Sequence, residues 1–315
     1  MQDKYGRNIN YLRLSITDLC NYRCIYCMDS DGVKKRDHSD ILSIEELINI
    51  GEVAVECGIN KIRITGGEPL VRGGVLKLLE GLKGINGLDE LVITTNGAKL
   101  SDMAMDLKAV GVDRLNISLD TLNEEKFKKI TRIGSLSEVL NGIEAANKAG
   151  FKNTKINVVL MAQINDDEIE DFVNLTRNNP VSVRFIELMP IGPSKEWYDE
   201  RYVSTDEVIK RVPELIALKK DGVSNVYKLK DAIGTVGLIS PISNCFCGQC
   251  NRLRITSDGR LRPCLHSDLE YNVRGLSNTE LADIFRIAVN NKPNSHHIVE
   301  KHTSDSSDYM HKIGG

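Results

Sequence analysis

The chain has 315 residues, 41% of them hydrophobic and 27% charged, with a formal net charge of −3. This is ordinary globular composition, and the length suits a barrel-sized domain with an appendage. The slightly acidic balance argues against a general nucleic-acid-binding surface. With 5% aromatic residues and one tryptophan, a stacking platform for single strands is also unexpected.

The N-terminus lacks an apolar signal-peptide core, and no later apolar run reaches membrane-spanning length. We therefore expect a cytoplasmic protein with no membrane partner. In that reducing compartment, the eight cysteines are expected to be ligands or free thiols. They cluster near both ends of the chain, and Cys57, alone in an apolar helical pattern, is expected to pack in the core.

The first two-thirds of the chain alternates β-rich runs with amphipathic segments. We predict strands at residues 11–17, 61–65, 90–96, 114–120, 155–161 and 182–189. Repeated strand–helix units imply parallel strands with right-handed crossovers, and six units are too few for an eightfold barrel. The sequence predicts an α/β fold, an open, partial (β/α)6 TIM-like barrel, with a doubly wound sheet as the alternative.

Helix ends are readable between these strands. Ser43 and Glu46 form a capping-box pattern, and Gly58 suits the end of that helix. Ser101 is expected to cap the next helix, and Asn165 with Glu168 to open a later one. A further helical segment spans residues 137–149.

The pattern changes after residue 220. We expect a hairpin around residues 257–259 and a helix over 277–290. The predicted division is a barrel over residues 1–225 and a C-terminal region over 226–315.

The stretch CNYRCIYC after the first strand holds Cys20, Cys24 and Cys27, spaced C-x3-C-x2-C. A zinc site completed by a distant cysteine or histidine is one interpretation. The other is a 4Fe-4S cluster with one iron that lacks a protein ligand.

Other polar residues follow the later strands. The second strand ends in TGGEPL, with Gly66, Gly67 and Glu68, and others end in TTNG, SLD and ELMPIG. Each motif alone is more typical of a turn or a helix cap. Because residues at the carboxyl ends of parallel strands share one rim, together they indicate a binding site.

A second cysteine group lies in NCFCGQCNRLRITSDGRLRPCL. Cys247, Cys250 and Cys264 make C-x2-C-x13-C, and Cys245 offers a fourth thiol for a closed structural site. Arg252 and Arg254 alternate on a strand and so share a face, which favours a phosphate-bearing ligand.

Four barrel strands carry a basic residue each, namely Arg13, Arg63, Lys155 and Arg184. A single such residue is usually a solvated edge or a paired charge. Four together suggest a lumen that neutralises a polyanion, for which triphosphate is the natural candidate.

CNYRCIYC with GGEP resembles the radical S-adenosylmethionine superfamily. The resemblance implies that S-adenosylmethionine chelates the open iron through its amino and carboxylate groups, and that reduction yields a 5′-deoxyadenosyl radical. Tyr26 matches the family's aromatic residue between the second and third cysteines, and residues 66–68 match its glycine-rich loop.

Across nearly the whole chain, the motifs GGEP, TTNG, NISLD, RFIELM, FCGQCNRLRIT, LRPCL and the terminal Gly314-Gly315 are similar to the GTP 3′,8-cyclase family of molybdenum cofactor biosynthesis. The resemblance implies two 4Fe-4S clusters with three cysteines each, the first on Cys20, Cys24 and Cys27 and the second, which binds guanine, on Cys247, Cys250 and Cys264. It implies S-adenosylmethionine contacts at Tyr26, Gly66, Gly67, Glu68, Ser118 and Met189. It implies GTP contacts at Arg13, Arg63, Thr94, Lys155, Arg184, Arg252 and Arg254, the last two also serving catalysis. Cys245 matches no ligand and stays a substitute or a spare thiol.

On this resemblance, the radical takes hydrogen from C3′ of GTP, and C3′ then attacks C8 to give (8S)-3′,8-cyclo-7,8-dihydroguanosine 5′-triphosphate. The expected partners are GTP, an electron donor and the next enzyme of the pathway, with a homodimer left open. The alternatives are a peptide-modifying radical enzyme and a non-catalytic iron–sulfur or zinc sensor.

The end of the chain gives two further expectations. The resemblance implies that the terminal double glycine reaches the active site rather than frays, and two residues without side chains would fit through a narrow gap. His296, His297, His302 and His311 are irregularly spaced, and we do not expect them to form a metal site.

Overall fold

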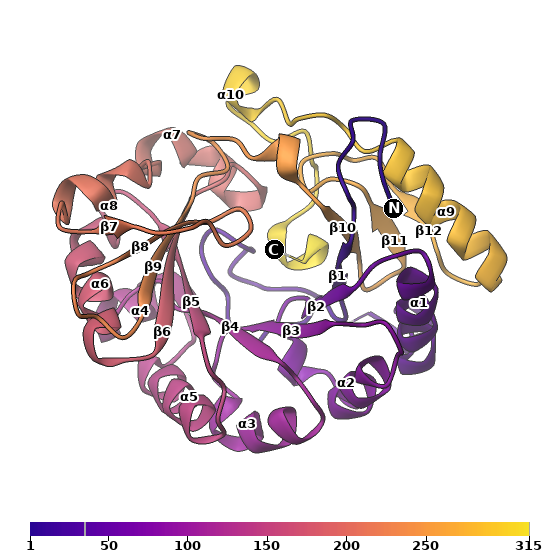
Figure 1. The fold of residues 1–315 in the computed structure, drawn as a ribbon, viewed down its shortest axis with the longest axis horizontal. Helices are drawn as coiled ribbons and strands as arrows, with labels where there is room; N and C mark the ends of the chain where they lie inside the picture. The colour runs from indigo at the N-terminus through magenta and orange to yellow at the C-terminus, as the bar shows by residue number, and fades with distance from the viewer. Residues whose placement is uncertain (35, 315) are drawn as a thin grey trace.

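The computed structural model describes residues 1–34 and 36–314, and Figure 1 shows them as a ring of strands enclosed by helices. A twelve-stranded sheet runs in the order β12-β11-β10-β1-β2-β3-β4-β5-β6-β9-β8-β7. The strands are β1 (Tyr11–Ser15), β2 (Lys61–Thr65), β3 (Glu90–Thr95), β4 (Arg114–Ser118), β5 (Thr154–Leu160), β6 (Val181–Glu187), β7 (Ile216–Ala217), β8 (Asn225–Lys228), β9 (Thr235–Ile239), β10 (Arg252–Ile255), β11 (Arg260–Arg262) and β12 (Tyr271–Asn272).

The crossover helices lie on the outside of this curved sheet (Figure 1). The helices are α1 (Ile44–Glu56), α2 (Val75–Lys83), α3 (Leu100–Ala109), α4 (Glu124–Thr131), α5 (Leu136–Lys148), α6 (Ile169–Asn178), α7 (Tyr198–Arg201), α8 (Asp206–Arg211), α9 (Asn278–Asn290), α10 (Ile298–Lys301) and α11 (Met310–Ile313). Outward-facing strand residues such as Leu12, Leu14 and Ile62 are fully buried in the main hydrophobic core. One covered face is typical of a barrel and excludes the doubly wound alternative.

The predicted partial barrel of six units is confirmed, since β1 to β6 pair in parallel at the expected segments. The C-terminal region adds a parallel strand at each edge, which we did not predict: β9 pairs with β6, and β10 pairs with β1. Among the described residues no ladder joins β9 to β10, so the barrel stays open. Side chains of eight parallel strands therefore face one lumen.

The predicted helix N-termini are confirmed in part. Ser43 and Glu46 form the expected capping box. Ser101 is wrong as a cap because α3 already begins at Leu100. A helix opens after Asn165 as expected, with a 3₁₀ turn over Asp166–Glu168 that continues into α6, but the Asn165 side chain does not cap it. Its amide instead accepts from the Met161 backbone N–H and donates to the Asp120 carbonyl. Its partners lie in the rim between β4 and β5, and sequence spacing does not reveal such tertiary contacts.

The predicted hairpin joins β10 to β11 with Gly259 at φ 82°, and the helix over 277–290 is α9. The division at residue 225 stays a prediction, and the sheet runs without a break from β6 to β9. None of the described helices is long and apolar enough to cross a membrane.

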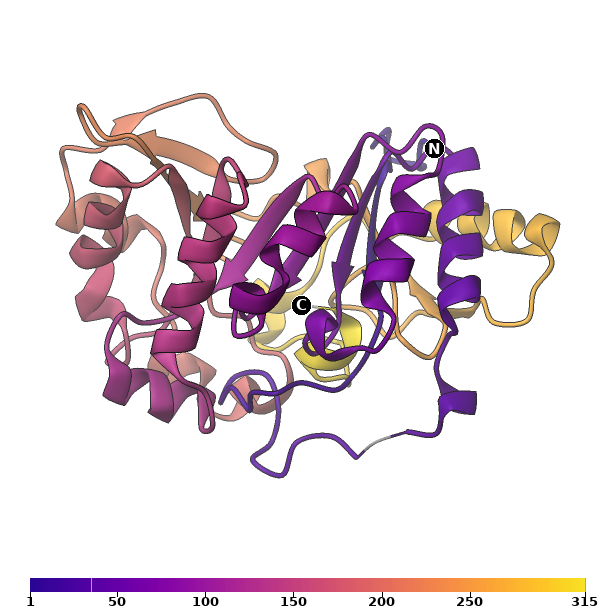
Figure 2. The same ribbon diagram turned by 90° about the horizontal axis from the view of Figure 1, so that it is seen from below.

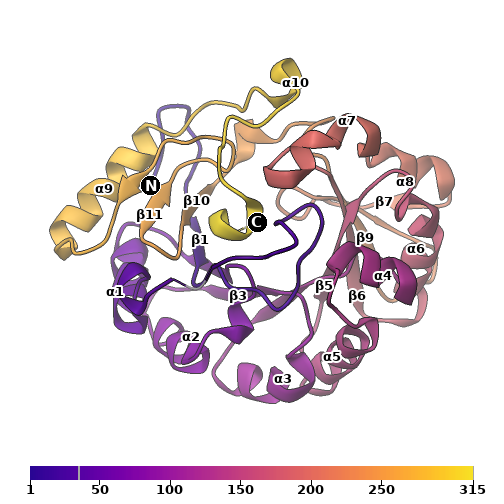
Figure 3. The ribbon, with the colours of Figure 1, turned by 180° about the vertical axis from the view of Figure 1, so that it is seen from behind.

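The C-terminal segment of the described chain returns to the barrel. Figure 2 shows the yellow C-terminal segment reaching under the ring of strands, and Figure 3 shows α11 beside the loop that follows β1. The His311 imidazole Nδ1 lies 3.3 Å from the Cys27 carbonyl oxygen, which ties the tail to that loop.

Candidate active site

The lumen holds a cavity of about 310 Å³. Both cysteine triads, the glycine-rich loop and the lumen arginines line it, so segments more than 200 residues apart in the chain share one chamber. The predicted residues on its wall are Arg13, Cys20, Cys24, Tyr26, Cys27, Arg63, Gly66, Gly67, Glu68, Thr94, Ser118, Arg184, Met189, Cys247, Cys250, Arg252, Arg254 and Cys264. Lys155 is the one predicted site residue that does not line it.

The first cysteine triad lies in the loop after β1. Burial raises the pKa of the Cys20 thiol to about 11 and that of Cys27 to about 12, so the triad needs a cation to become a set of thiolates. One zinc ion about 2.3 Å from each sulfur would hold the sulfurs roughly 3.8 Å apart. Among the described residues, the ligand atoms of these three cysteines do not all lie within 4.8 Å of one another. The three thiols are therefore not arranged around one zinc ion.

Gly66 and Gly67 hold this loop against the end of β2. The Gly67 N–H donates to the Thr17 carbonyl at 2.7 Å, and the Glu68 N–H donates to the Leu19 carbonyl at 2.8 Å. A Cβ on Gly66 would lie 2.5 Å from the Thr17 oxygen, and one on Gly67 would overlap the Leu19 oxygen. The close backbone approach that the glycines permit is thus to the cysteine loop itself.

Two buried carboxyls organise the adjoining rim. Glu68 accepts hydrogen bonds from the Leu70 N–H, the Thr95 hydroxyl and the Asn96 N–H, while burial raises its pKa to about 7. Asp120 accepts from the Tyr26 hydroxyl at 2.7 Å, and burial raises its pKa to about 6. These bonds fix the ends of β2, β3 and β4 around one place beside the first triad.

The second triad lies across the cavity, around the start of β10. Burial would raise the pKa of the Cys250 thiol, but nearby Lys292 and Arg252 outweigh burial and lower it. Lys292 is buried and also donates to the carbonyls of Arg252 and Pro263. This positive surrounding favours the thiolate form of Cys250, which is the form that ligates iron. At Cys264, burial outweighs it and raises the pKa of the thiol.

Cys245 sits outside this chamber. It lines a smaller neighbouring cavity, and its sulfur lies 3.6 Å from His296 Nε2. Cys245, Cys247 and His296 bring their ligand atoms within 4.8 Å of one another. However, His296 Nδ1 accepts from the Ile298 N–H, and Nε2 lies 2.9 Å from the Pro241 carbonyl. The proton therefore sits on Nε2, which makes that nitrogen a donor rather than a ligand.

The opposite wall of the lumen is basic. Arg13 on β1 is paired in register with Arg63 on β2 and with Arg254 on β10, so three guanidinium groups stand side by side. Burial, with Arg254 and Arg63 nearby, lowers the pKa of Arg13 well below its usual value, and burial with Arg252 lowers that of Arg254 to about 10. Such mutual repulsion is relieved by an anion in the lumen.

Buried polar atoms in this wall lack protein partners. Within the described part of the chain, the Tyr11 hydroxyl, the Nε atoms of Arg63 and Arg252, and the Thr94 hydroxyl make no hydrogen bond. Leaving such groups unpaired costs about 1–3 kcal/mol each. The wall is therefore shaped for a ligand rich in oxygen atoms, as a nucleoside triphosphate is.

The basic wall continues onto β5 and β6. Lys155 and Arg184 are buried, and both contact the carboxylate of Asp221 in the turn between β7 and β8. Arg184 lines the cavity with the other basic residues, whereas Lys155 does not.

The C-terminal tail enters the lumen. The Arg254 guanidinium donates to the Ile313 carbonyl at 3.2 Å and to the Gly314 carbonyl at 2.7 Å, and Met310 and His311 line the cavity. Gly314 has φ 68°, and a Cβ there would overlap the Thr65 hydroxyl. The expected approach of the tail to the site is thus seen through Gly314, while Gly315 lies outside the described residues.

Some wall residues were missed from sequence. Asn116 and Asn157 line the cavity from β4 and β5, and the alternation of each strand with Ser118 and Lys155 could have found them. Tyr11 could have been found through its alternation with Arg13. His266 and Lys292 reach the wall through tertiary packing, which no local pattern signals.

This fold and site define the class of protein. Residues 14–176 match the family model "Radical SAM superfamily", and residues 181–298 match "Molybdenum Cofactor Synthesis C". Among solved structures, Streptococcus suis SuiB superposes with a TM-score of 0.60 at 16% identity over 89% of this chain and 65% of that one. The structure of anSMEcpe with bound AdoMet gives 0.58 at 15% identity over 94% and 80%. The chain is a radical S-adenosylmethionine protein.

Curated relatives identify the family within that superfamily. The GTP 3′,8-cyclase of Peptoclostridium acidaminophilum is 50% identical over 99% of this chain and 98% of its own length. Those of Clostridium botulinum strain Hall and Alkaliphilus oremlandii are 46% and 45% identical over the full length of both chains. The chain belongs to the GTP 3′,8-cyclase family.

Proposed function

We propose that this chain converts GTP into (8S)-3′,8-cyclo-7,8-dihydroguanosine 5′-triphosphate, the first step of molybdenum cofactor biosynthesis. The observation that carries the proposal is the single cavity of about 310 Å³ lined by both cysteine triads and the lumen arginines. The reaction forms the C3′–C8 bond, C3′ loses a hydrogen atom, and guanine gains one electron and one proton. The product is therefore an isomer of GTP.

Cys20, Cys24 and Cys27 would hold a 4Fe-4S cluster that, with S-adenosylmethionine, supplies a 5′-deoxyadenosyl radical. Around the adjoining rim, Gly66, Gly67, Glu68, Ser118 and Met189 are the proposed cofactor contacts. The Glu68 carboxylate accepts from three groups of this chain, so its role is to fix the rim. Tyr26, anchored on Asp120, would set the lateral position of the cofactor.

Cys247, Cys250 and Cys264 would hold the second 4Fe-4S cluster, which would bind guanine. Arg13, Arg63, Arg252 and Arg254 offer forked donors beside it, of which Nε of Arg63 and of Arg252 are unpaired. Thr94, Lys155 and Arg184 are proposed to complete the triphosphate contacts. Guanidinium forks orient phosphate oxygens. Arg252 or Arg254 is the proposed source of the final proton, and the pKa of Arg254, lowered to about 10 by burial and Arg252, favours its release.

The tail would close the chamber. Ile313 and Gly314 carbonyls take up two donors of Arg254, and α11 lies beside the cysteine loop (Figure 3). A reactive carbon radical requires water to be kept away from it, and a short helix ending in glycine fills the opening without a side chain. The further partners proposed are an electron donor and an enzyme that consumes the product, with a homodimer left open.

An anaerobic turnover assay tests the function. Reconstituted protein receives S-adenosylmethionine, a strong reductant and GTP, ATP or no nucleotide, and mass spectrometry follows 5′-deoxyadenosine and new nucleotide isomers. We expect GTP-dependent 5′-deoxyadenosine with a matching isomer of GTP. Cleavage without nucleotide preference would favour a peptide-modifying enzyme, and no cleavage by a protein with both clusters intact would favour a sensor.

A further inference from the structure

Asp221 makes an unusual contact with two buried cations. Its Oδ2 lies 2.6 Å from Lys155 Nζ and 2.6 Å from Arg184 Nη2. The Lys155 and Arg184 side chains are 5% and 9% exposed, whereas that of Asp221 is 57% exposed. A single anionic oxygen shared by an ammonium and a guanidinium is also how a phosphate oxygen binds to such a pair.

In the protein without ligand, this contact gives Lys155 and Arg184 a counter-ion. Lys155 and Arg184 enter the lumen from neighbouring strands, with Arg114 also near both. Two buried cations without a counter-ion would be strongly destabilising. Asp221 supplies the counter-ion, but it does so from the surface turn, and of its two partners Arg184 lines the cavity while Lys155 does not.

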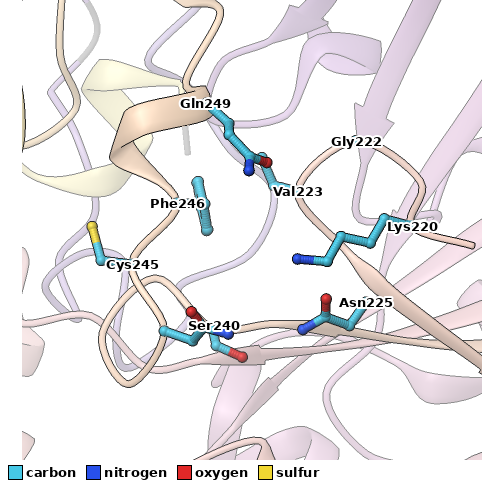
Figure 4. A pocket seen from close by; sticks show the side chains of 9 residues that line it. Lys220, Gly222, Val223, Asn225, Ser240, Cys245, Phe246 and Gln249 are labelled. Carbon is cyan, nitrogen blue, oxygen red and sulfur yellow. The ribbon is translucent and has the colours of Figure 1, made fainter. Parts of the chain in front are cut away.

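The turn that carries Asp221 is anchored at one end and surrounded by open space at its tip. The backbones of Asp221 and Ser224 exchange two hydrogen bonds of 3.1 Å, and Ser224 is fully buried, so the turn is anchored at one end. Between them, Gly222 has φ 60°, and a Cβ there would meet no atom within 4 Å. Val223 lines both the large cavity and a second cavity of about 70 Å³, shown with Lys220 and Phe246 in Figure 4.

We infer that Asp221 is a built-in substitute for a phosphate of the substrate: it occupies Lys155 and Arg184 in the free enzyme and leaves them when the triphosphate binds. This inference rests on the proposed function, because GTP is the ligand that displaces the carboxylate. Asp221 thereby acts as a specificity-determining residue that keeps small free phosphate anions out of the lumen.

The exclusion follows from tethering. A carboxylate held on a short turn competes at an effective concentration on the order of millimolar or higher. Free phosphate or pyrophosphate makes few other contacts and loses this competition. GTP also binds through its ribose and base, so it offsets the cost of displacing Asp221.

The test uses the reconstituted holoenzyme under anaerobic conditions and measures the binding of inorganic pyrophosphate and of GTP by calorimetry. Asp221→Asn keeps the shape of the side chain and removes its charge. Asp167→Asn is the matched control, because Asp167 pairs with Lys126 at the same 2.6 Å and is 69% exposed, outside the cavity wall.

We expect Asp221→Asn to bind pyrophosphate at least about tenfold more tightly than the wild type, to bind GTP no less tightly, and Asp167→Asn to change neither. Unchanged pyrophosphate binding, or GTP binding weakened about fivefold or more, would overturn the inference and make Asp221 a support for the occupied site. The pyrophosphate result stands even if turnover assays disprove the cyclase function, so the two failures are distinguishable.

Hydrogen exchange on the wild type gives a readout that needs no variant. GTP should raise the exchange rate of amides in residues 219–223, because the turn loses its side-chain anchor, and pyrophosphate should not. Slower exchange of this turn with GTP would contradict displacement.

Discussion

Lys155 illustrates how the lumen tunes single residues. Burial and the neighbouring Arg184 lower the pKa of Lys155 to about 7, against the opposing effect of Asp221. Partial burial disfavours the charge on Asp221, but Lys155 and Arg184 outweigh it and lower the pKa of Asp221 to about 2. In the free protein, then, the carboxylate is ionised throughout the physiological range while the ammonium titrates near neutrality.

This residue predicts a pH dependence for GTP binding. A bound phosphate favours charged Lys155 and raises its pKa, so affinity is highest below pH 7 and falls as pH rises above 7. Between pH 7.5 and 8.5, where GTP itself no longer titrates, we expect the dissociation constant to rise up to about tenfold. Calorimetry on the wild type and on Lys155→Arg measures it.

Lys155→Arg should show a flat profile over that range, since a guanidinium stays charged. Equal slopes for the two proteins would assign the pH dependence to another group.

At the scale of elements, the active site depends on the hydrogen bonds between the residues that follow β2 and the loop after β1. The backbone of residues 66–68 bonds to the carbonyls of Thr17 and Leu19, and the Glu68 side chain bonds onward to the end of β3. Main-chain contacts thus position the cysteine loop together with side-chain contacts such as that of Tyr26 with Asp120. A substitution at Gly66 or Gly67 should therefore disturb the binding of the first cluster.

Gly67→Ala should therefore destabilise the protein and impair assembly of the first cluster. The new Cβ would overlap the Leu19 oxygen and lie 2.7 Å from the Asp18 oxygen, and overpacking of this kind costs about 1–3 kcal/mol. Denaturant unfolding of the cluster-free protein and iron content after reconstitution measure the two effects.

Gly73→Ala is the control, because a Cβ at Gly73 meets no atom within 4 Å. If the two variants unfold alike and bind equal iron, close packing at Gly67 is not what holds the loop.

At the scale of the whole molecule, the C-terminal tail returns to the first strands. Gly314 lies against Ser15 and Thr65, and Arg254 on β10 holds its carbonyl. Met310 and His311 of the same segment line the cavity, and Figure 2 shows the yellow C-terminal segment beneath the strands.

Gly314→Ala should lower the turnover rate more than it lowers stability, because the overlap with Thr65 displaces the tail from Arg254. Gly150→Ala is the matched control, since Gly150 also has positive φ, 81°, but open space around it. Turnover and thermal unfolding of both variants separate the effects: equal loss of turnover would point to backbone strain rather than to the position of the tail.

Much of this architecture is predictable from sequence because it is local and periodic. The six strands of the partial barrel follow from alternating patterns, and Arg252 with Arg254 could be placed on one face from their spacing alone. The strands β9 and β10 could not be placed at the two sheet edges, because pairing of distant segments leaves no local signal. The ion pair between Asp221 and Lys155 could not be predicted for the same reason, since 66 residues separate them in the sequence.

Delivery of the radical to the ribose of GTP within one chamber is tested most directly with GTP carrying deuterium at C3′. After anaerobic turnover with S-adenosylmethionine and reductant, mass spectrometry locates the label. We predict deuterium in 5′-deoxyadenosine and a cyclised product that has lost it. Unlabelled 5′-deoxyadenosine, with deuterium retained in the nucleotide, would contradict this mechanism.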